Sequence, residues 1–228
     1  MKIQPIICGF MMFFMMSFVP VKNNFLKPSA STKIEFMYQA LNSNGYKTPN
    51  LESYSSALKG FYILKEKGKI QKNILTIIDF SLSSKTKRLW IINLDENKIL
   101  LNTWAAHGKN SGDDFATNFS NETDSNKSSL GFFVTAEVYQ GKHGMSLKLD
   151  GLEKGINDNA RQRAVVLHGA DYVSEKFIKN HNRLGKSQGC PAVPLALSKK
   201  IITIIKDKSC LFIYHPSLGG METIKLIS

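Results

Sequence analysis

Apolar residues recur every three or four positions in two segments near the start of the chain. The first segment spans residues 32–44 and is followed by Gly45, and the second spans residues 51–67 and is followed by Gly68. This spacing places the apolar residues on one face of a helix, and glycine is typical of the position just after a helix end. The sequence therefore predicts two helices that pack as a hairpin against the rest of the chain.

From residue 74 the pattern changes to short runs rich in Ile, Val, Phe and Trp, separated by turn residues. The predicted strands span residues 74–80, 88–94, 99–106, 131–138, 146–149, 164–168, 192–194 and 210–214. One more helix is predicted over residues 198–206, with Ser198 as its N-cap. Many short strands with few helices predict a mainly β fold: an antiparallel β-sandwich or partly closed barrel with an N-terminal helical pair and one C-terminal helix.

The N-terminal segment predicts export. Lys2 precedes a mostly apolar stretch at residues 6–19, and Pro20 and polar sequence follow. This order is typical of a secretory signal peptide, and the stretch is shorter than the roughly 20 residues of a membrane-spanning helix. No clean small-residue cleavage site follows, so an uncleaved anchor that associates with a membrane is the alternative. We divide the chain into residues 1–20 (signal peptide or anchor), 21–70 (linker and helical pair) and 71–228 (β-rich domain).

Charge narrows the class of partner. The 228 residues carry a formal net charge of +12, which favours an anionic neighbour such as a nucleic acid, an anionic lipid or an acidic polymer of the cell wall. The lysines are scattered and accompany no nucleic-acid-binding motif, so the sequence argues against nucleic acid. A polar stretch at residues 107–129, rich in Gly, Ser, Asn and Asp, predicts a long loop, and such loops in compact domains are often functional. Nothing in the sequence indicates an oligomeric state.

Two cysteines lie outside the N-terminal segment, and an exported protein could join them in a disulfide. Cys210 begins an apolar run typical of a buried strand, where a thiol acts as a small apolar side chain. Cys190 lies instead among Ser, Gly and Pro, with Arg183 and Lys186 nearby to favour its thiolate. The different settings favour separate roles.

Cys190 and His168 are a candidate nucleophile and base, because a thiol must lose its proton to react and an imidazole is the usual acceptor. His168 ends an apolar run, and the carbonyl of Gly169 could orient its ring. Gly189 permits unusual torsions, and Ser187 with the N–H groups of residues 188–190 could form a nest for an oxyanion. From these residues alone, a thiol enzyme and a pair of well-packed structural residues are equally open.

The remaining histidines do not predict a metal site. His107, His143, His181 and His215 show no spacing typical of metal ligands. His107 and His143 each precede a glycine in a loop-like segment, so we expect them to shape loops or contact a substrate. His215 is expected at a strand end.

The residues His168-Gly169-Ala170, followed by Ser-Gln-Gly-Cys-Pro at 187–191, resemble the signature of the L,D-transpeptidases, the YkuD-like family. The likeness covers about residues 75–216 and looks like the branch called the murein L,D-transpeptidase catalytic-domain family. The stretches that carry it lie at residues 106–112, 119–121, 128–132, 139–144 and 157–160. Three positions depart from the broader family: Gln188 stands in place of a histidine, Ala192 near the place of an asparagine or arginine, and Ser128-Ser129 in place of Thr-Pro.

The resemblance implies a bacterial enzyme of the periplasm or cell envelope that acts on peptidoglycan stem peptides. Cys190 would form a thioester with the donor peptide, His168 would take and return the proton, and the Gly169 carbonyl would orient His168. The backbone of Gln188 and Gly189 would help to hold the oxyanion, with Ser187 supporting the loop. Arg183, His107 and His143 are candidates for substrate contact. The resemblance implies no metal or organic cofactor.

Two other functions fit the same residues. An L,D-carboxypeptidase would resolve the thioester with water instead of a second peptide. A non-catalytic wall-binding domain would keep the fold without the activity, but the intact Cys190–His168 pair argues against it.

Overall fold

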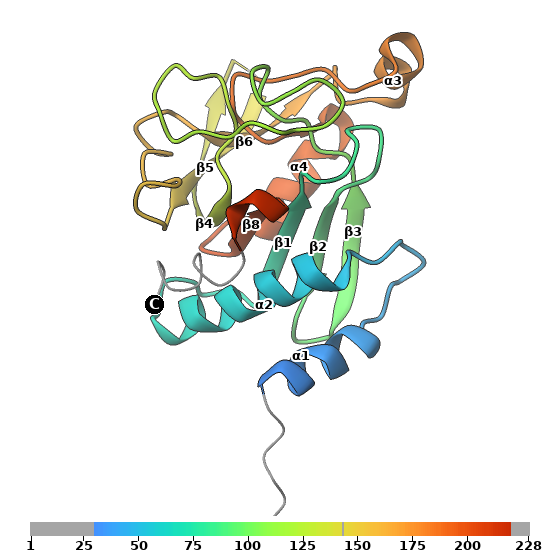
Figure 1. The fold of residues 1–228 in the computed structure, drawn as a ribbon, viewed down its shortest axis with the longest axis vertical. Coiled ribbons are helices and arrows are strands. Elements are labelled where there is room, and N and C mark those ends of the chain that lie inside the picture. The colour runs from blue at the N-terminus through green and yellow to red at the C-terminus, as the bar shows by residue number, and fades with distance from the viewer. Residues whose placement is uncertain (1–29, 143, 220–228) are drawn as a thin grey trace, which may run out of the picture.

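The computed structural model describes residues 30–142 and 144–219, and eight strands in this part of the chain form one sheet (Figure 1). The strands are β1 (Ile74–Asp79), β2 (Leu89–Asn93), β3 (Lys98–Thr103), β4 (Gly131–Gly141), β5 (Gly144–Gly151), β6 (Val166–Ala170), β7 (Ala192–Pro194) and β8 (Cys210–Tyr214). The helices are α1 (Ala30–Gln39), α2 (Leu51–Glu66), α3 (Glu175–His181), α4 (Leu195–Ile205) and a short 3-10 helix, η1 (Pro216–Leu218). The N-terminal segment and His143 lie outside the described residues.

The sheet is barrel-like and nearly closed, as the sequence predicted. Its strand order is β3-β2-β1-β8-β4-β5-β6-β7. Ala106, just beyond β3 at one edge, forms a bridge with Ala192 of β7 at the other, with N···O distances of 2.8 and 3.3 Å. The expectation of an antiparallel sheet is wrong for two pairs, because β1–β8 and β6–β7 are parallel. The second of these parallel pairs builds the candidate site.

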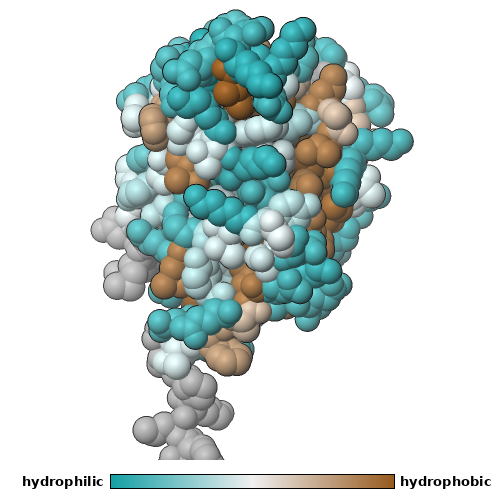
Figure 2. All heavy atoms as spheres, turned by 90° about the vertical axis from the view of Figure 1, so that its right-hand side faces the viewer, coloured by the Kyte–Doolittle hydropathy of each residue, from teal (hydrophilic) through white to brown (hydrophobic). Residues whose placement is uncertain are grey.

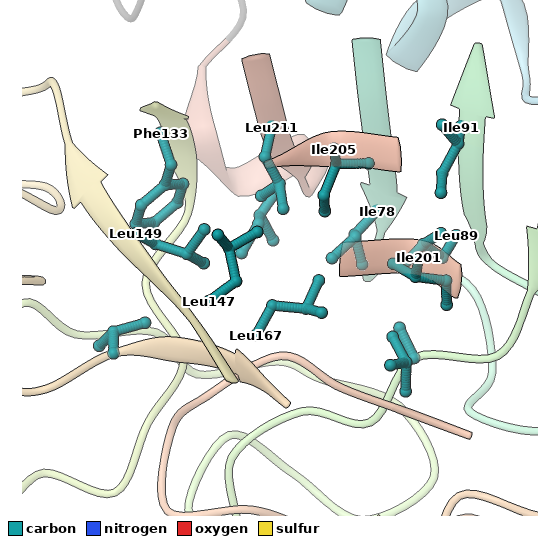
Figure 3. Packing of buried hydrophobic residues seen from close by; sticks show 14 of the residues in the cluster. Ile78, Leu89, Ile91, Phe133, Leu147, Leu149, Leu167, Ile201, Ile205 and Leu211 are labelled. Atoms are coloured by element: carbon teal, nitrogen blue, oxygen red, sulfur yellow. The ribbon is translucent and has the colours of Figure 1, made fainter. Parts of the chain in front are cut away.

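Apolar residues fill both faces of the sheet, because successive residues of a strand point to opposite sides. In β8, Leu211 and Ile213 join a core that Ile201, Ile202 and Ile205 of α4 complete (Figure 3). Cys210, Phe212 and Tyr214 point the other way, into a core that α1 and α2 cover. The sheet is therefore packed between α4 on one side and the N-terminal helical pair on the other.

The helical pair lies close to the sheet. Asn50 caps α2, since its side chain accepts a hydrogen bond from the Ser53 N–H at 2.7 Å. In the middle of α2, Gly60 leaves room for Phe132, which stacks on Phe212 with ring centroids 4.2 Å apart. A side chain at position 60 would collide with the Phe132 ring, so this glycine sets how closely α2 approaches.

Two helix predictions need correction, and one helix was missed. The first helix spans Ala30–Gln39 rather than residues 32–44, because Asn42 forms a bridge with Lys98, the first residue of β3. The last helix begins at Leu195, and Ser198 is not its cap: it is buried in the first turn, where its hydroxyl donates to the Leu195 carbonyl at 2.8 Å. Helix α3 was not predicted, because its seven residues bury no side chain and so show no apolar face.

Figure 2 views the molecule from the side of β3 and shows hydrophilic side chains over most of this face, with hydrophobic ones in separate groups between them. No helix in the described part of the chain is long and apolar enough to cross a membrane.

Candidate active site

Cys190 and His168 line one cleft of about 540 Å³. His168 lies in the middle of β6, and β7 pairs with β6 in parallel so that His168 is opposite Ala192. Cys190 precedes Ala192 by two residues. The parallel pairing therefore brings together two side chains that are 22 positions apart in the sequence.

The His168 ring is held by its neighbour. It is almost fully buried, and its Nδ1 lies 3.0 Å from the Gly169 carbonyl oxygen. A carbonyl oxygen only accepts, so this contact is a hydrogen bond when Nδ1 carries the proton. In this tautomer of the neutral ring, Nε2 carries no proton, so Nε2 is the basic nitrogen. This is the contact that the sequence suggested for Gly169.

The Cys190 thiol is half-buried and touches the segment before β6. Its Sγ accepts from the Val166 N–H at 3.5 Å and donates to the Ala164 carbonyl at 3.8 Å. Burial raises the pKa of the thiol above its ordinary value, whereas the Val166 N–H and the positive charges of Arg163 and Lys142 lower it. Burial prevails, so the resting thiol needs a base to lose its proton.

The cations that act on the thiol are not those that the sequence suggested. Arg183 Nε and Lys186 Nζ both pair with Asp113, each at 3.0 Å. Lys186 lines the cleft, but Arg183 is not among the lining residues. Their charges are therefore shared with a carboxylate, and the effect on the thiol comes from Arg163 and Lys142 instead.

The loop before Cys190 is closed on itself. The Ser187 hydroxyl donates to the Cys190 carbonyl at 2.6 Å and accepts from the Gly189 N–H at 3.1 Å. The Gly189 N–H is thus occupied, which corrects the prediction that this residue helps to hold an oxyanion. Within the described residues, the N–H groups of Gln188 and Cys190 have no hydrogen-bond partner, so two donors are left for an oxyanion.

The polar loop at residues 107–129 braces the cysteine loop. The Ser128 hydroxyl donates to the Gly189 carbonyl at 3.1 Å and accepts from the Gly108 N–H at 3.0 Å. Gly189 has φ 122°, and a Cβ there would lie 2.8 Å from the Lys127 carbonyl oxygen. Only glycine fits both this conformation and this close approach.

His107 does not contact the cleft. It is fully buried, its Nδ1 accepts from Arg88 Nη2 at 2.8 Å, and its Nε2 donates to the Gly112 carbonyl at 3.4 Å. Burial and the Arg88 charge lower its pKa to about 4, so the ring is neutral. The prediction of substrate contact is therefore wrong for His107, which shapes the loop instead. His143 lies outside the described residues.

Sequence reasoning missed several residues that line the cleft. They include Arg163, Tyr139, Lys142, Ser146 and Tyr172. Arg163 stands near the thiol because the residues before two parallel strands meet at the same edge of the sheet. The sequence shows that Arg163 comes just before β6. This position indicates a place near Cys190 only once β6 is known to pair with β7.

Within residues 30–142 and 144–219, no group of three or more His, Cys, Asp or Glu side chains could hold a metal ion. Cys190 and Cys210 are both free thiols. Cys210 is fully buried in β8, whereas Cys190 opens to the cleft.

Comparison with known proteins gives one match over most of the chain. A family model of the L,D-transpeptidase catalytic domain matches residues 46–214. No curated protein matches the sequence.

Three similar solved structures share little sequence with the chain. An L,D-transpeptidase from Mycobacterium smegmatis is 10% identical, with a TM-score of 0.38 over 63% of this chain and 59% of its own. The helical cell shape determining protein Pgp2 (K307A mutant) from Campylobacter jejuni is 14% identical, with a TM-score of 0.44 over 70% and 56%. An L,D-transpeptidase from Stackebrandtia nassauensis is 12% identical, with a TM-score of 0.38 over 80% and 89%. The chain thus spans under two thirds of the first two.

Proposed function

Because the chain belongs to the L,D-transpeptidase catalytic-domain family, we propose that it is an exported cysteine acyltransferase that joins peptidoglycan stem peptides. The observation that carries the proposal is that Cys190 and His168 line one cleft, with Nδ1 of His168 bonded to the Gly169 carbonyl. The net charge of +12 suits a polymer whose stem peptides carry carboxylates.

In the first step, Nε2 of His168 takes the thiol proton as Sγ of Cys190 attacks the donor carbonyl, on the L-residue side of the bond to a terminal D-amino acid. The carbonyl oxygen becomes an oxyanion, for which the N–H groups of Gln188 and Cys190 are the candidate donors. The carbon–nitrogen bond then breaks. The His168 imidazolium returns the proton to the departing amine, and a thioester remains on Cys190.

In the second step, an amine of a second stem peptide attacks the thioester. His168 takes a proton from that amine and returns it to Sγ, so the new amide forms and the thiol is regenerated. The Gly169 contact keeps Nε2 available as the base in both steps. Attack by water in place of the amine would release a trimmed peptide.

The proposal is tested by incubating the purified chain with tetrapeptide-containing wall fragments and identifying the products by mass. Cross-linked dimers are expected from the wild type and from Cys210→Ala, which removes the other described thiol. Cys190→Ala and His168→Ala should form none while keeping a native circular dichroism spectrum. Dimers from either of these two variants at the wild-type rate would refute the mechanism, and trimmed peptides alone would establish the hydrolase.

The N-terminal segment supports export to the periplasm or cell envelope. Mass analysis of the protein purified from an envelope fraction would show whether residues 1–20 have been removed. Recovery of the chain in the cytoplasm alone would contradict export.

A further inference from the structure

Arg163 carries a charge in the cleft that no carboxylate balances. It is half-buried and lines the cleft with Cys190. None of the ion pairs found among the described residues includes it. Burying an unpaired charge is costly, so its presence beside the thiol calls for an explanation.

Neutral oxygens of the polar loop satisfy its N–H groups. Nη1 donates to the Ser120 carbonyl at 2.7 Å and to the Ser129 hydroxyl. Nη2 donates to the Lys127 carbonyl at 2.7 Å and to the Ser125 hydroxyl at 3.3 Å. These four bonds fix the guanidinium without neutralising it. They also occupy the N–H groups of Nη1 and Nη2 that could otherwise form a bidentate pair with a substrate carboxylate.

The guanidinium packs against the cysteine loop. A Cβ on Gly189 would lie 3.4 Å from Nη2 of Arg163, so the charge is next to the residue that precedes Cys190. The Lys127 carbonyl that accepts from Nη2 is also the atom that faces Gly189. Arg163 thus connects the polar loop to the backbone that carries the thiol.

Arg161, two residues earlier, shows the opposite arrangement. It is exposed, and its guanidinium bonds to the carboxylates of Glu137 and Asp150. Arg161 is therefore a matched control, because it lies two residues from Arg163 in the sequence and its charge is balanced by two carboxylates.

We propose that Arg163 is a positioning residue that acts through Cys190: its unbalanced charge stabilises the thiolate, and its four hydrogen bonds hold the polar loop against the cysteine loop. The role of the thiolate in turnover rests on the proposed function, but the effect on the thiol itself does not. The pKa of Cys190 supports the proposal, because the Arg163 charge opposes the increase that burial causes.

Other charged and titratable groups line the same cleft. They are Asp124, Tyr139, Lys142, His168, Tyr172 and Lys186. Lys142 is exposed, and Lys186 shares its charge with Asp113. Of the cations in the cleft, Arg163 therefore combines a fixed position with an unshared charge.

The test measures the rate of alkylation of Cys190 by iodoacetamide as a function of pH in the full chain, with Cys8 and Cys210 both replaced by alanine so that Cys190 is the one remaining thiol. A nearby positive charge favours the thiolate, so Arg163→Gln should slow alkylation at neutral pH by roughly threefold to tenfold. Arg161→Gln should leave the profile unchanged. Arg163→Lys keeps the charge but not the four bonds, and should fall nearer to the wild type than to Arg163→Gln.

Circular dichroism at each pH restricts the comparison to folded protein. An alkylation profile for Arg163→Gln that coincides with the wild type would overturn the proposal, as would equal shifts in Arg163→Lys and Arg163→Gln. If the alkylation rate depends on Arg163 as expected but the wild-type protein joins no stem peptides, the proposed function alone is refuted.

Discussion

Glu153 gives the sharpest prediction about stability, because it is a fully buried carboxyl with no cation beside it. Its Oε2 accepts from the Phe132 N–H and from the Asn157 side chain at 3.2 Å. Its Oε1 is buried without a hydrogen-bond partner among the described residues. Burial raises the pKa of this carboxyl from 4.5 to about 7, despite the two hydrogen bonds that lower it.

The sign follows from the direction of this change. Folding favours the protonated form of Glu153, so the stabilisation is complete below pH 4.5 and is lost as the pH rises through about 7. Each pKa unit corresponds to about 1.4 kcal/mol, so the increase from 4.5 to about 7 corresponds to a change of about 3 kcal/mol in the free energy of unfolding. Glu153→Gln keeps the shape and an oxygen acceptor but cannot ionise, so it removes this dependence.

The assay is urea unfolding of the full chain at several pH values from 4.5 to 8. The free energy of unfolding of the wild type should fall by about 3 kcal/mol relative to that of Glu153→Gln over this range. Glu122→Gln, which changes an exposed carboxyl, should run parallel to the wild type. If Glu153→Gln also runs parallel to the wild type, the buried carboxyl does not titrate as the structure predicts and the reasoning is refuted.

Three further substitutions test the fold around the site. Gly189→Ala meets φ 122° and a Cβ that would lie 2.8 Å from the Lys127 carbonyl oxygen, so thermal unfolding should show a loss of about 1–3 kcal/mol; an unchanged Tm would contradict the strain. Asn50→Ala removes the cap of α2 and should cost about 0.5–2 kcal/mol in urea unfolding, and no loss would mean that the Ser53 contact contributes nothing. Cys210→Ser buries a hydroxyl and should cost about 1–3 kcal/mol, whereas stem-peptide turnover by the folded variant should be unchanged; lost turnover would show that Cys210 has a catalytic part.

The strands could be predicted because their apolar residues are buried on both faces of the sheet and leave continuous apolar runs, as in residues 89–92 of β2 and residues 210–214 of β8. The pairing of those strands could not, since it joins residues far apart in the chain. The parallel pair β6–β7 shows the consequence for the site. His168 and Cys190 could be chosen as chemical types, but Arg163 could not be placed beside them without that pairing.

The burial of loop residues could not be predicted from the sequence either. His107 lies in a polar stretch, and the sequence does not reveal that Arg88, the residue just before β2, donates to its ring. The capping prediction at Ser198 failed for a local reason, because the apolar residues Leu195 and Leu197 already belong to the helix. Turn-like polar residues inside a helix mislead when their hydroxyls bond back to the preceding turn, as Ser198 does.

If Cys190 carries the acyl group during turnover, the mass of the protein itself should show it. The purified chain is mixed with a tetrapeptide stem fragment, quenched in acid within the first turnover, and digested to locate the adduct. We expect a mass increase equal to the fragment without its terminal D-amino acid, carried by Cys190 and absent from Cys190→Ala. An adduct on Cys210, or turnover by Cys190→Ala at the wild-type rate, would contradict this role of Cys190.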